Sequence, residues 1–129
     1  MSARILIIDD DLPSLALVEY LLQSAGHATT TADDGERGMR EALTQRFDLI
    51  ISDLHLPGLT GYEIVARLRA TPEWRRVPVV AVTASSMVGD RESVLAAGFD
   101  GYISKPIEPE NFVIEVQRYL ETAPAGGGS

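Results

Sequence analysis

The chain alternates five short strand-like segments, of which most are apolar and one is rich in Thr, with five longer segments in which apolar residues recur at helical spacing. The short segments predict strands and cover residues 5–8, 28–32, 49–53, 79–83 and 102–104, of which 28–32 is the Thr-rich one. The longer segments predict helices at about residues 13–25, 35–45, 61–70, 90–97 and 112–120. This alternation predicts a parallel sheet with helices on both faces, joined by right-handed connections.

Residues that start and stop helices support these boundaries. Pro13 suits the first turn of a helix and Asp90 can cap one, whereas Gly26 and Gly98 can end the helices that precede them. On the second predicted helix, we expect Met39, Ala42 and Leu43 to share one buried face. The expected fold is therefore α/β: a flavodoxin-like (βα)5 three-layer sandwich whose five parallel strands are ordered 2-1-3-4-5.

The length and composition fit a single domain. A chain of 129 residues with 45% hydrophobic and 23% charged residues can bury one core. We expect the domain to cover residues 1–121, because residues 122–129 are rich in Gly and resemble a flexible linker. The chain has no cysteine, which excludes disulfides and thiolate metal sites.

Charge and hydropathy narrow the environments that suit the chain. The formal net charge of −8 disfavours direct binding to nucleic acid, whose phosphates need Lys and Arg partners. No apolar stretch has the length of a membrane span, and no signal-peptide pattern follows Met1. We therefore expect a cytoplasmic protein that does not insert into membranes and that attracts cations or basic protein surfaces.

Polar residues follow four of the predicted strands at the point where each strand ends. The first strand runs into Asp9 and Asp10, and the third ends in Asp53. The fourth ends in Thr83, and Lys105 follows the fifth. In the expected strand order, these ends lie side by side at the crevice where open parallel sheets bind ligands. The sequence thus predicts a cluster of carboxylates with one hydroxyl and one ammonium group.

Such a cluster favours phosphoryl chemistry. Two carboxylates roughly 4 Å apart repel each other by on the order of 4 kcal/mol at an effective dielectric constant of about 20. Mg²⁺ takes oxygen ligands and bridges carboxylates to phosphates, so it would offset that repulsion. Lys105 would neutralise further charge, and the Thr83 hydroxyl would donate to a phosphate oxygen. The combination suits a carboxylate, Asp53, that accepts a phosphoryl group.

Each of these residues has a more ordinary interpretation when it is taken alone. Asp11 is expected to cap the helix that follows it. Thr83 would be an ordinary strand residue, Lys105 a surface lysine and Tyr102 a half-buried aromatic residue. The specificity of the pattern lies in the joint occurrence of these residues at the ends of the correct strands.

Four segments carry motifs that are specific as a set. They are I-L-I-I-D-D-D, D-L-I-I-S-D-L-H-L-P-G-L-T-G-Y-E, P-V-V-A-V-T-A and G-Y-I-S-K-P-I. From about Arg4 to Leu120, the chain resembles the receiver domain of two-component response regulators, the family of the chemotaxis protein CheY. The stretch T-A-S-S-M-V-G-D is most similar to receivers of hybrid histidine kinases and of DivK-type single-domain regulators.

The resemblance implies a role for each residue of the predicted cluster. Asp53 matches the phosphoacceptor, and Lys105 matches the lysine that pairs with the phosphoryl group. Asp9 and Asp10 match the acidic pair that holds Mg²⁺, Asp10 directly and Asp9 partly through water. The backbone carbonyl of His55 matches a further metal ligand. The implied cofactor is Mg²⁺, with Mn²⁺ as a substitute.

The resemblance also implies a conformational switch. Thr83 matches the hydroxyl that turns toward the phosphoryl group, and Tyr102 matches the aromatic residue whose rotamer is coupled to it. The peptide bond between Lys105 and Pro106 is expected to be cis.

The implied function is that of a response regulator in a phosphorelay, not of an enzyme with a separate substrate. The chain would catalyse only its own Mg²⁺-dependent phosphorylation and dephosphorylation. It would receive its phosphoryl group from a histidine kinase or a histidine phosphotransfer protein, and it would signal to a downstream effector protein. It is expected to be a monomer or a phosphorylation-dependent dimer.

Two histidines receive separate interpretations. The side chain of His55 is expected to face solvent at the rim of the site, although a second metal ligand or a proton shuttle is an alternative. In the family, this position and that of Ser85 flank the path of the hydrolytic water. His27 is expected to be a surface residue far from the cluster.

Four other functions share part of the pattern. A flavodoxin-like electron carrier would need a first loop that cradles phosphate, whereas this loop is acidic. A dehalogenase-type phosphatase usually carries a second acid where this chain has His55. A nucleotide-binding enzyme lacks support, because no glycine-rich phosphate motif occurs. A non-phosphorylated pseudoreceiver that serves as a protein-interaction module is the main alternative, but it usually loses one of the acidic or lysine positions.

Overall fold

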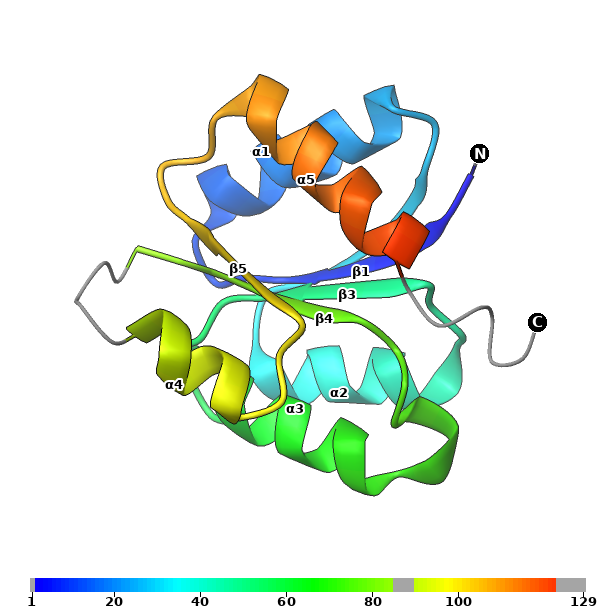
Figure 1. The fold of residues 1–129 in the computed structure, drawn as a ribbon, viewed down its shortest axis with the longest axis vertical. Helices are drawn as coiled ribbons and strands as arrows, with labels where there is room; N and C mark the ends of the chain where they lie inside the picture. The colour runs from blue at the N-terminus through cyan, green and yellow to red at the C-terminus, as the bar shows by residue number, and fades with distance from the viewer. Residues whose placement is uncertain (1, 85–89, 123–129) are drawn as a thin grey trace.

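Five parallel strands form the middle layer of the protein, and helices cover both faces of the sheet (Figure 1). The computed structural model describes residues 2–84 and 90–122. The strands are β1 (Arg4–Ile8), β2 (Ala28–Ala32), β3 (Leu49–Ser52), β4 (Val79–Thr83) and β5 (Gly101–Ser104). The helices are α1 (Leu12–Ser24), α2 (Gly35–Thr44), α3 (Gly61–Ala70), α4 (Asp90–Ala96) and α5 (Pro109–Thr122), with a 3-10 turn η1 (Pro72–Trp74) before β4.

The strand order is β2-β1-β3-β4-β5, which confirms the prediction from the sequence. All four strand pairs are parallel. Ile8 at the end of β1 lies opposite Ser52 of β3, and Thr83 at the end of β4 lies opposite Ser104 of β5. The carboxyl ends of these four strands therefore lie at one edge of the sheet.

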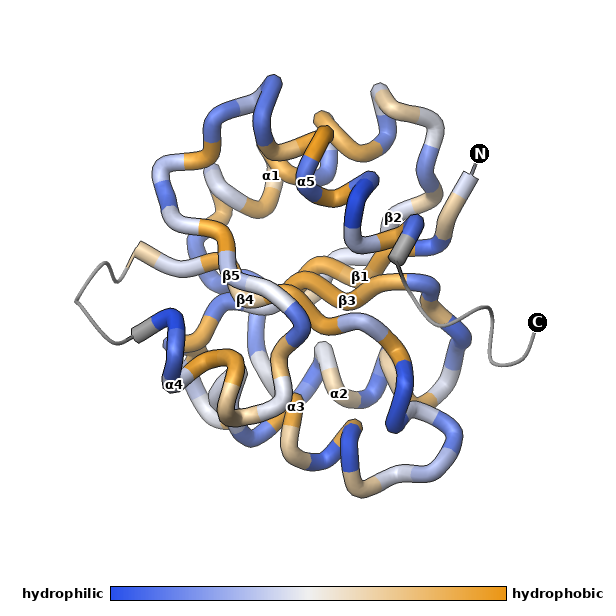
Figure 2. Tube along the Cα trace, viewed as in Figure 1, coloured by the Kyte–Doolittle hydropathy of each residue, from blue (hydrophilic) through white to orange (hydrophobic). Residues whose placement is uncertain are grey.

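Helices cover both faces of the sheet, and successive side chains of a strand point to opposite faces. Each central strand therefore contributes side chains to two cores. In β1, Leu6 and Ile8 pack into the core beneath α2, α3 and α4, whereas Ile5 and Ile7 pack into the core beneath α1 and α5. All four side chains are 0–1% exposed, and burial of each stabilises the fold by about 1.5–3 kcal/mol. Figure 2 shows the resulting concentration of hydrophobic residues along the central strands.

Helix boundaries follow the signals in the sequence. Pro13 lies in the first turn of α1, as predicted. Gly26 and Gly98 follow α1 and α4 with φ angles of 94° and 114°. Glycine adopts this left-handed conformation without the steric cost that a Cβ atom brings.

Two expectations concern the chain beyond these elements. Of the predicted linker, residue 122 is the last residue of α5, and residues 123–129 lie outside the described part of the chain, as does Ser85. Among the helices that the structure describes, none combines the length and the apolar character needed to cross a bilayer.

The predicted inner face of α2 is wrong at one position. Met39 and Ala42 are buried as expected, but the Leu43 side chain is 52% exposed. The helix packs tightly against β1 at Gly38, where a Cβ atom would overlap the side chain of Ile8. The buried stripe therefore runs through positions 35, 38, 39 and 42, and Leu43, one residue further round the helix, lies outside it.

His27 is buried, whereas the sequence suggested a surface residue. It is 7% exposed, and its Nδ1 atom accepts a hydrogen bond from the Ala3 amide at 3.0 Å. Its own amide donates to the Leu22 carbonyl at the end of α1. His27 thus connects the end of α1 to the segment that enters β1. Burial lowers the pKa of His27 below 6.5, and Asp48 opposes this shift.

We expect protonation of His27 to destabilise the fold. Because the pKa is lower in the folded state, the stabilisation is complete above the unfolded value of about 6.5 and is lost as pH falls toward the folded value. His27→Leu leaves the Ala3 amide without its acceptor, which costs about 1–3 kcal/mol. Urea unfolding at several pH values should show lower stability of this variant and a smaller loss below about pH 6.5. His55→Ala, at an exposed histidine, is the control, and an unchanged pH dependence in His27→Leu would contradict the assignment.

Candidate functional site

Backbone hydrogen bonds bring the predicted site residues together at the carboxyl edge of the sheet. The Asp53 amide donates to the Ile8 carbonyl at 2.9 Å, which fixes the end of β3 beside the end of β1. The Lys105 amide donates to the Thr83 carbonyl at 2.9 Å, which fixes the end of β5 beside the end of β4. Three carboxylates, from Asp9, Asp10 and Asp53, meet there with ligand oxygens that all lie within 4.8 Å of one another. We call these three residues the aspartate cluster.

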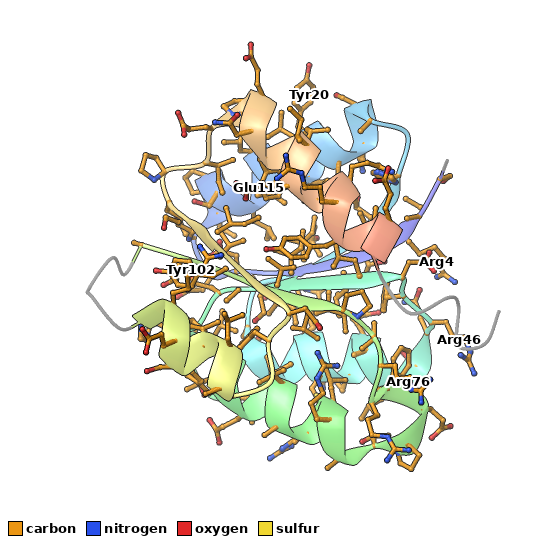
Figure 3. All side chains as sticks on the ribbon, viewed as in Figure 1. Arg4, Tyr20, Arg46, Arg76, Tyr102 and Glu115 are labelled. Carbon is orange, nitrogen blue, oxygen red and sulfur yellow. The ribbon has the colours of Figure 1, made fainter. Side chains whose placement is uncertain are left out.

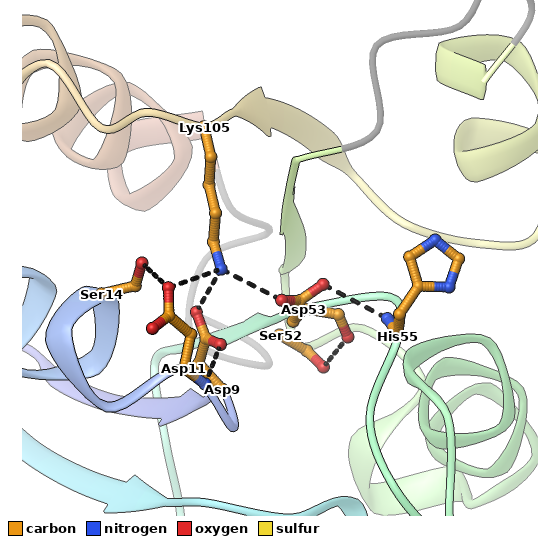
Figure 4. A network of polar contacts seen from close by, with 7 residues as sticks. All are labelled: Asp9, Asp11, Ser14, Ser52, Asp53, His55 and Lys105. Carbon is orange, nitrogen blue, oxygen red and sulfur yellow. Dashed lines mark hydrogen bonds and ion pairs between the residues drawn. The ribbon is translucent and has the colours of Figure 1, made fainter.

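The ammonium group of Lys105 lies between two carboxylates of the cluster (Figure 4). Its Nζ atom is 2.9 Å from Asp9 Oδ2 and 3.1 Å from Asp53 Oδ2. The Lys105 side chain is 12% exposed, and the side chains of Asp9 and Asp53 are 5% and 10% exposed. These contacts are charge-assisted hydrogen bonds that are largely shielded from water.

Both carboxylate oxygens of Asp53 accept a hydrogen bond. Oδ2 accepts from Lys105, and Oδ1 accepts from the His55 amide at 3.2 Å. The His55 side chain is exposed and points away from Asp53, as expected for a residue at the rim (Figure 4). The His55 amide therefore orients the carboxylate, while the imidazole takes no part in the contacts drawn there.

Two serines take part in the network, and the sequence analysis missed both. Ser52 is fully buried, and its hydroxyl donates to the backbone carbonyl of Asp53 at 2.9 Å. A hydroxyl after three apolar residues of β3 is the signal that would have found it. The Ser14 hydroxyl donates to Asp11 Oδ2 at 2.7 Å. The position of Ser14 in the sequence gives no sign that its hydroxyl binds a carboxylate and not solvent.

The prediction that the Asp11 side chain caps α1 is wrong. Asp11 occupies the N-cap position of α1, but its carboxylate accepts no backbone hydrogen bond of that helix. It accepts the Ser14 hydroxyl and lies 4.0 Å from Lys105 Nζ. The attraction of the ammonium group and the hydroxyl accounts for this orientation.

The predicted switch residues occupy the ends of β4 and β5. Thr83 is 1% exposed at the last position of β4. Tyr102 on β5 is half-buried, packs against the core beneath α2, α3 and α4, and lies opposite Ala81 of β4 (Figure 3). The peptide bond between Lys105 and Pro106 is cis, as expected.

The family of the chain follows from a comparison with known protein families. The model of the response regulator receiver domain matches residues 5–117. The chain belongs to the response regulator receiver family. Receiver domains of this family are signalling modules of two-component systems that interact with kinases and effectors.

Relatives of this receiver domain include the polar-differentiation response regulator DivK of Brucella anthropi. It is 34% identical over 123 residues, which cover 95% of this chain and 100% of the relative. The chemotaxis response regulator CheY4 of Vibrio cholerae is 32% identical with a TM-score of 0.87, covering 92% of this chain and 99% of that one. The receiver domain of the sensor histidine kinase PA1611 from Pseudomonas aeruginosa PAO1 is 35% identical with a TM-score of 0.86, covering 95% and 100%. The resemblance to CheY-like and DivK-type receivers is thus confirmed.

Burial and pairing set the protonation equilibria of this receiver site. Burial raises the pKa of Asp9 above 3.8, and this effect outweighs the lowering by Lys105 and by the Asp11 amide, which donates to Asp9 at 2.9 Å. Burial alone would lower the pKa of Lys105, but its hydrogen bonds to Asp9 and Asp53 raise it above 10.5. Lys105 is therefore a fixed positive charge at neutral pH.

The donor set of this receiver fits a hard divalent cation. The site holds four carboxylates, from the aspartate cluster and Asp11, and a single ammonium group, which leaves a formal charge of −3. Mg²⁺ prefers oxygen ligands, and the cluster supplies carboxylate oxygens from two neighbouring strand ends. The PA1611 receiver was solved with a magnesium ion coordinated in its active site cleft.

Proposed function

We propose that this receiver accepts a phosphoryl group from phosphohistidine on Asp53 and then signals to a partner protein. One observation carries the proposal. The Asp53 side chain is 10% exposed at a strand end, with the Lys105 ammonium 3.1 Å away and the other two carboxylates of the cluster within 4.8 Å. A nucleophilic carboxylate, a cation and a metal-binding acidic pair are the parts that phosphoryl transfer requires.

In the proposed reaction, a carboxylate oxygen of Asp53 attacks the phosphorus atom of the phosphohistidine. The new phosphorus–oxygen bond forms while the phosphorus–nitrogen bond breaks, and the imidazole nitrogen leaves with its electron pair. Asp9, Asp10, Asp53 and the backbone carbonyl of His55 would hold Mg²⁺, or Mn²⁺ in its place, which supplies charge neutralisation for the transferred group. Lys105, already beside Asp53 Oδ2, would pair with a phosphoryl oxygen.

Phosphorylation changes what Thr83 and Lys105 can bind. The phosphoryl group brings greater negative charge and three acceptor oxygens, so the hydroxyl and the ammonium group gain a partner that exists only in this state. Thr83 and Tyr102 lie on the adjacent strands β4 and β5, and the Lys105 amide that follows β5 donates to the Thr83 carbonyl. The proposed output surface is β5 with the flanking α4 and α5.

Thr83→Ala should separate phosphorylation from the conformational change. The variant lacks the hydroxyl that would follow the phosphoryl group, but Asp53 and Lys105 keep their contacts. We expect labelling to persist, while the phosphorylation-induced changes in the backbone NMR signals of Tyr102 and its neighbours are lost. A conservative Thr83→Ser variant should retain them. Full signal changes in Thr83→Ala would contradict the role of the hydroxyl.

The proposal includes partners, extent and location. The phosphodonor is a histidine kinase or a histidine phosphotransfer protein, and the output is a downstream effector protein. The receiver covers residues 1–121, and it acts as a monomer or a phosphorylation-dependent dimer. It catalyses only its own phosphorylation and dephosphorylation, and it acts in the cytoplasm, where kinases use ATP. The acidic charge of the chain supports a protein partner rather than nucleic acid.

The decisive test is phosphotransfer from a donor that carries phosphohistidine. We expect the purified protein to gain one phosphoryl group in the presence of Mg²⁺, and peptide mapping to locate it on Asp53. Removal of Mg²⁺ with a chelator should prevent the gain. Failure of every phosphohistidine donor and of small phosphoramidates to label the folded protein would favour a non-phosphorylated pseudoreceiver.

A further inference from the structure

We propose that a hollow between α2 and α3 is a docking site for an acidic peptide segment of a partner protein. The hollow has a volume of about 470 Å³. Met39 and Leu59 contribute buried apolar surface to its lining, and the exposed Leu43 stands beside them. Arg40 from α2 and Arg67 from α3 line the same hollow. Methionine and arginine with an exposed aliphatic side chain are a composition typical of protein interfaces.

Both arginines are available to an external anion. Among the residues that the structure describes, no carboxylate lies within 4.0 Å of the guanidinium group of Arg40 or Arg67. Glu63, one turn before Arg67, accepts the Thr60 amide at 3.0 Å in the capping box of α3, so its interaction with Arg67 is electrostatic and not an ion pair in contact. Glu36 also lines the hollow, so its lining contains two arginines and one carboxylate. The hollow is therefore locally positive on a chain whose net charge is −8.

The chemistry of the lining selects the occupant. The excess positive charge favours carboxylates, and Leu43 favours an apolar side chain between them. Sites for small molecules usually enclose most of the ligand surface. Here Arg40, Leu43 and Arg67 are all exposed, so the hollow is too open for such a site. A peptide in which acidic residues flank leucine-type residues matches it, because its neighbouring residues add contacts outside the hollow.

The hollow is preformed and adjoins the phosphoacceptor loop. Gly35 lies so close to Leu59 that a Cβ atom would overlap the Leu59 carbonyl, which holds this wall against α2. Gly58, with a φ of 75°, forms the turn beside it. A preformed surface avoids part of the ordering cost of binding. The same wall belongs to the loop after Asp53, so an occupant would contact that loop whether or not Asp53 is phosphorylated.

The test is an NMR titration of the unphosphorylated protein with a defined probe. The probe is a capped octapeptide in which two leucines are flanked on each side by three glutamates. We expect saturable shifts of the amide signals of Met39, Leu43 and Leu59. The double variant Arg40→Glu with Arg67→Glu should bind at least about tenfold more weakly, because two attractive charges become repulsive. Leu43→Ser should weaken binding by about threefold through the lost apolar contact.

A matched control separates this site from the general charge of the protein. Arg76→Glu with Arg91→Glu changes the net charge equally at two exposed arginines outside the hollow, and it should change the affinity by less than about twofold. Equal weakening by both double variants would overturn the proposal. So would an absence of saturable shifts, or equal binding of a peptide with glutamine in place of glutamate. The same shifts produced by free glutamate alone would indicate a small-anion site, and shifts that depend on protein concentration without peptide would indicate a second copy. Either result would also overturn it.

Discussion

Asp53→Asn is expected to abolish the Mg²⁺-dependent gain of a phosphoryl group from acetyl phosphate. The amide keeps the volume of the carboxylate, and its oxygen can still accept the His55 amide, so the fold should be retained. It lacks the anionic oxygen that would attack phosphorus. Intact-protein mass spectrometry under conditions that fully label the wild type should show no labelled species.

The control for this experiment is a second carboxylate that lies outside the aspartate cluster. Asp33 is exposed and pairs at 4.0 Å with Arg37 on α2, so Asp33→Asn removes the same charge without touching the cluster. This variant should be labelled at the rate of the wild type. Undiminished labelling of Asp53→Asn would show that another residue is the phosphoacceptor and would contradict the assignment.

Lys105→Met should slow labelling by about 10²-fold, because it removes the cation expected to stabilise the transferred group. The same change should strengthen Mg²⁺ binding by at least about tenfold. Lys105 is a unit positive charge in contact with two carboxylates of the cluster, and it opposes any further cation there. Isothermal titration calorimetry measures the affinity, and labelling with acetyl phosphate measures the rate. The two quantities should move in opposite directions.

A control variant distinguishes a local effect from a change in net charge. Arg76→Met removes one positive charge at an exposed position among the arginines at the opposite edge of the sheet (Figure 3). Its Mg²⁺ affinity should stay within about twofold of the wild type, since screening by salt weakens such distant charges. Unchanged or weaker Mg²⁺ binding in Lys105→Met would show that the ammonium group does not compete with the cation.

The architecture was predictable because the signals that define it are local and repeated. The central strands β1, β3 and β4 are short apolar runs, and glycines such as Gly26 and Gly98 occur where the chain must adopt a left-handed conformation. The errors arose where the distance between elements decides burial. Leu43 fits a helical apolar face, but the close approach at Gly38 rotates that face away from it. His27 lies next to a glycine turn, and only the position of Ala3 makes it a buried acceptor.

The site was predictable to the extent that it depends on strand ends. Asp9, Asp53, Thr83 and Lys105 come together because the strand order puts their backbones side by side. Side-chain orientation was less accessible to sequence patterns. Asp11 is drawn to an ammonium group from a distant part of the chain instead of the amides of its own helix.

Lys105 is the sole lysine among the 129 residues of the chain. Biosynthetic incorporation of ¹⁵N-lysine would therefore give a single side-chain ammonium resonance, which arises from the site itself. Because the raised pKa keeps the group protonated and its burial slows exchange with water, that resonance should be observable near neutral pH. Its position would report on the occupancy of the site without any attached label.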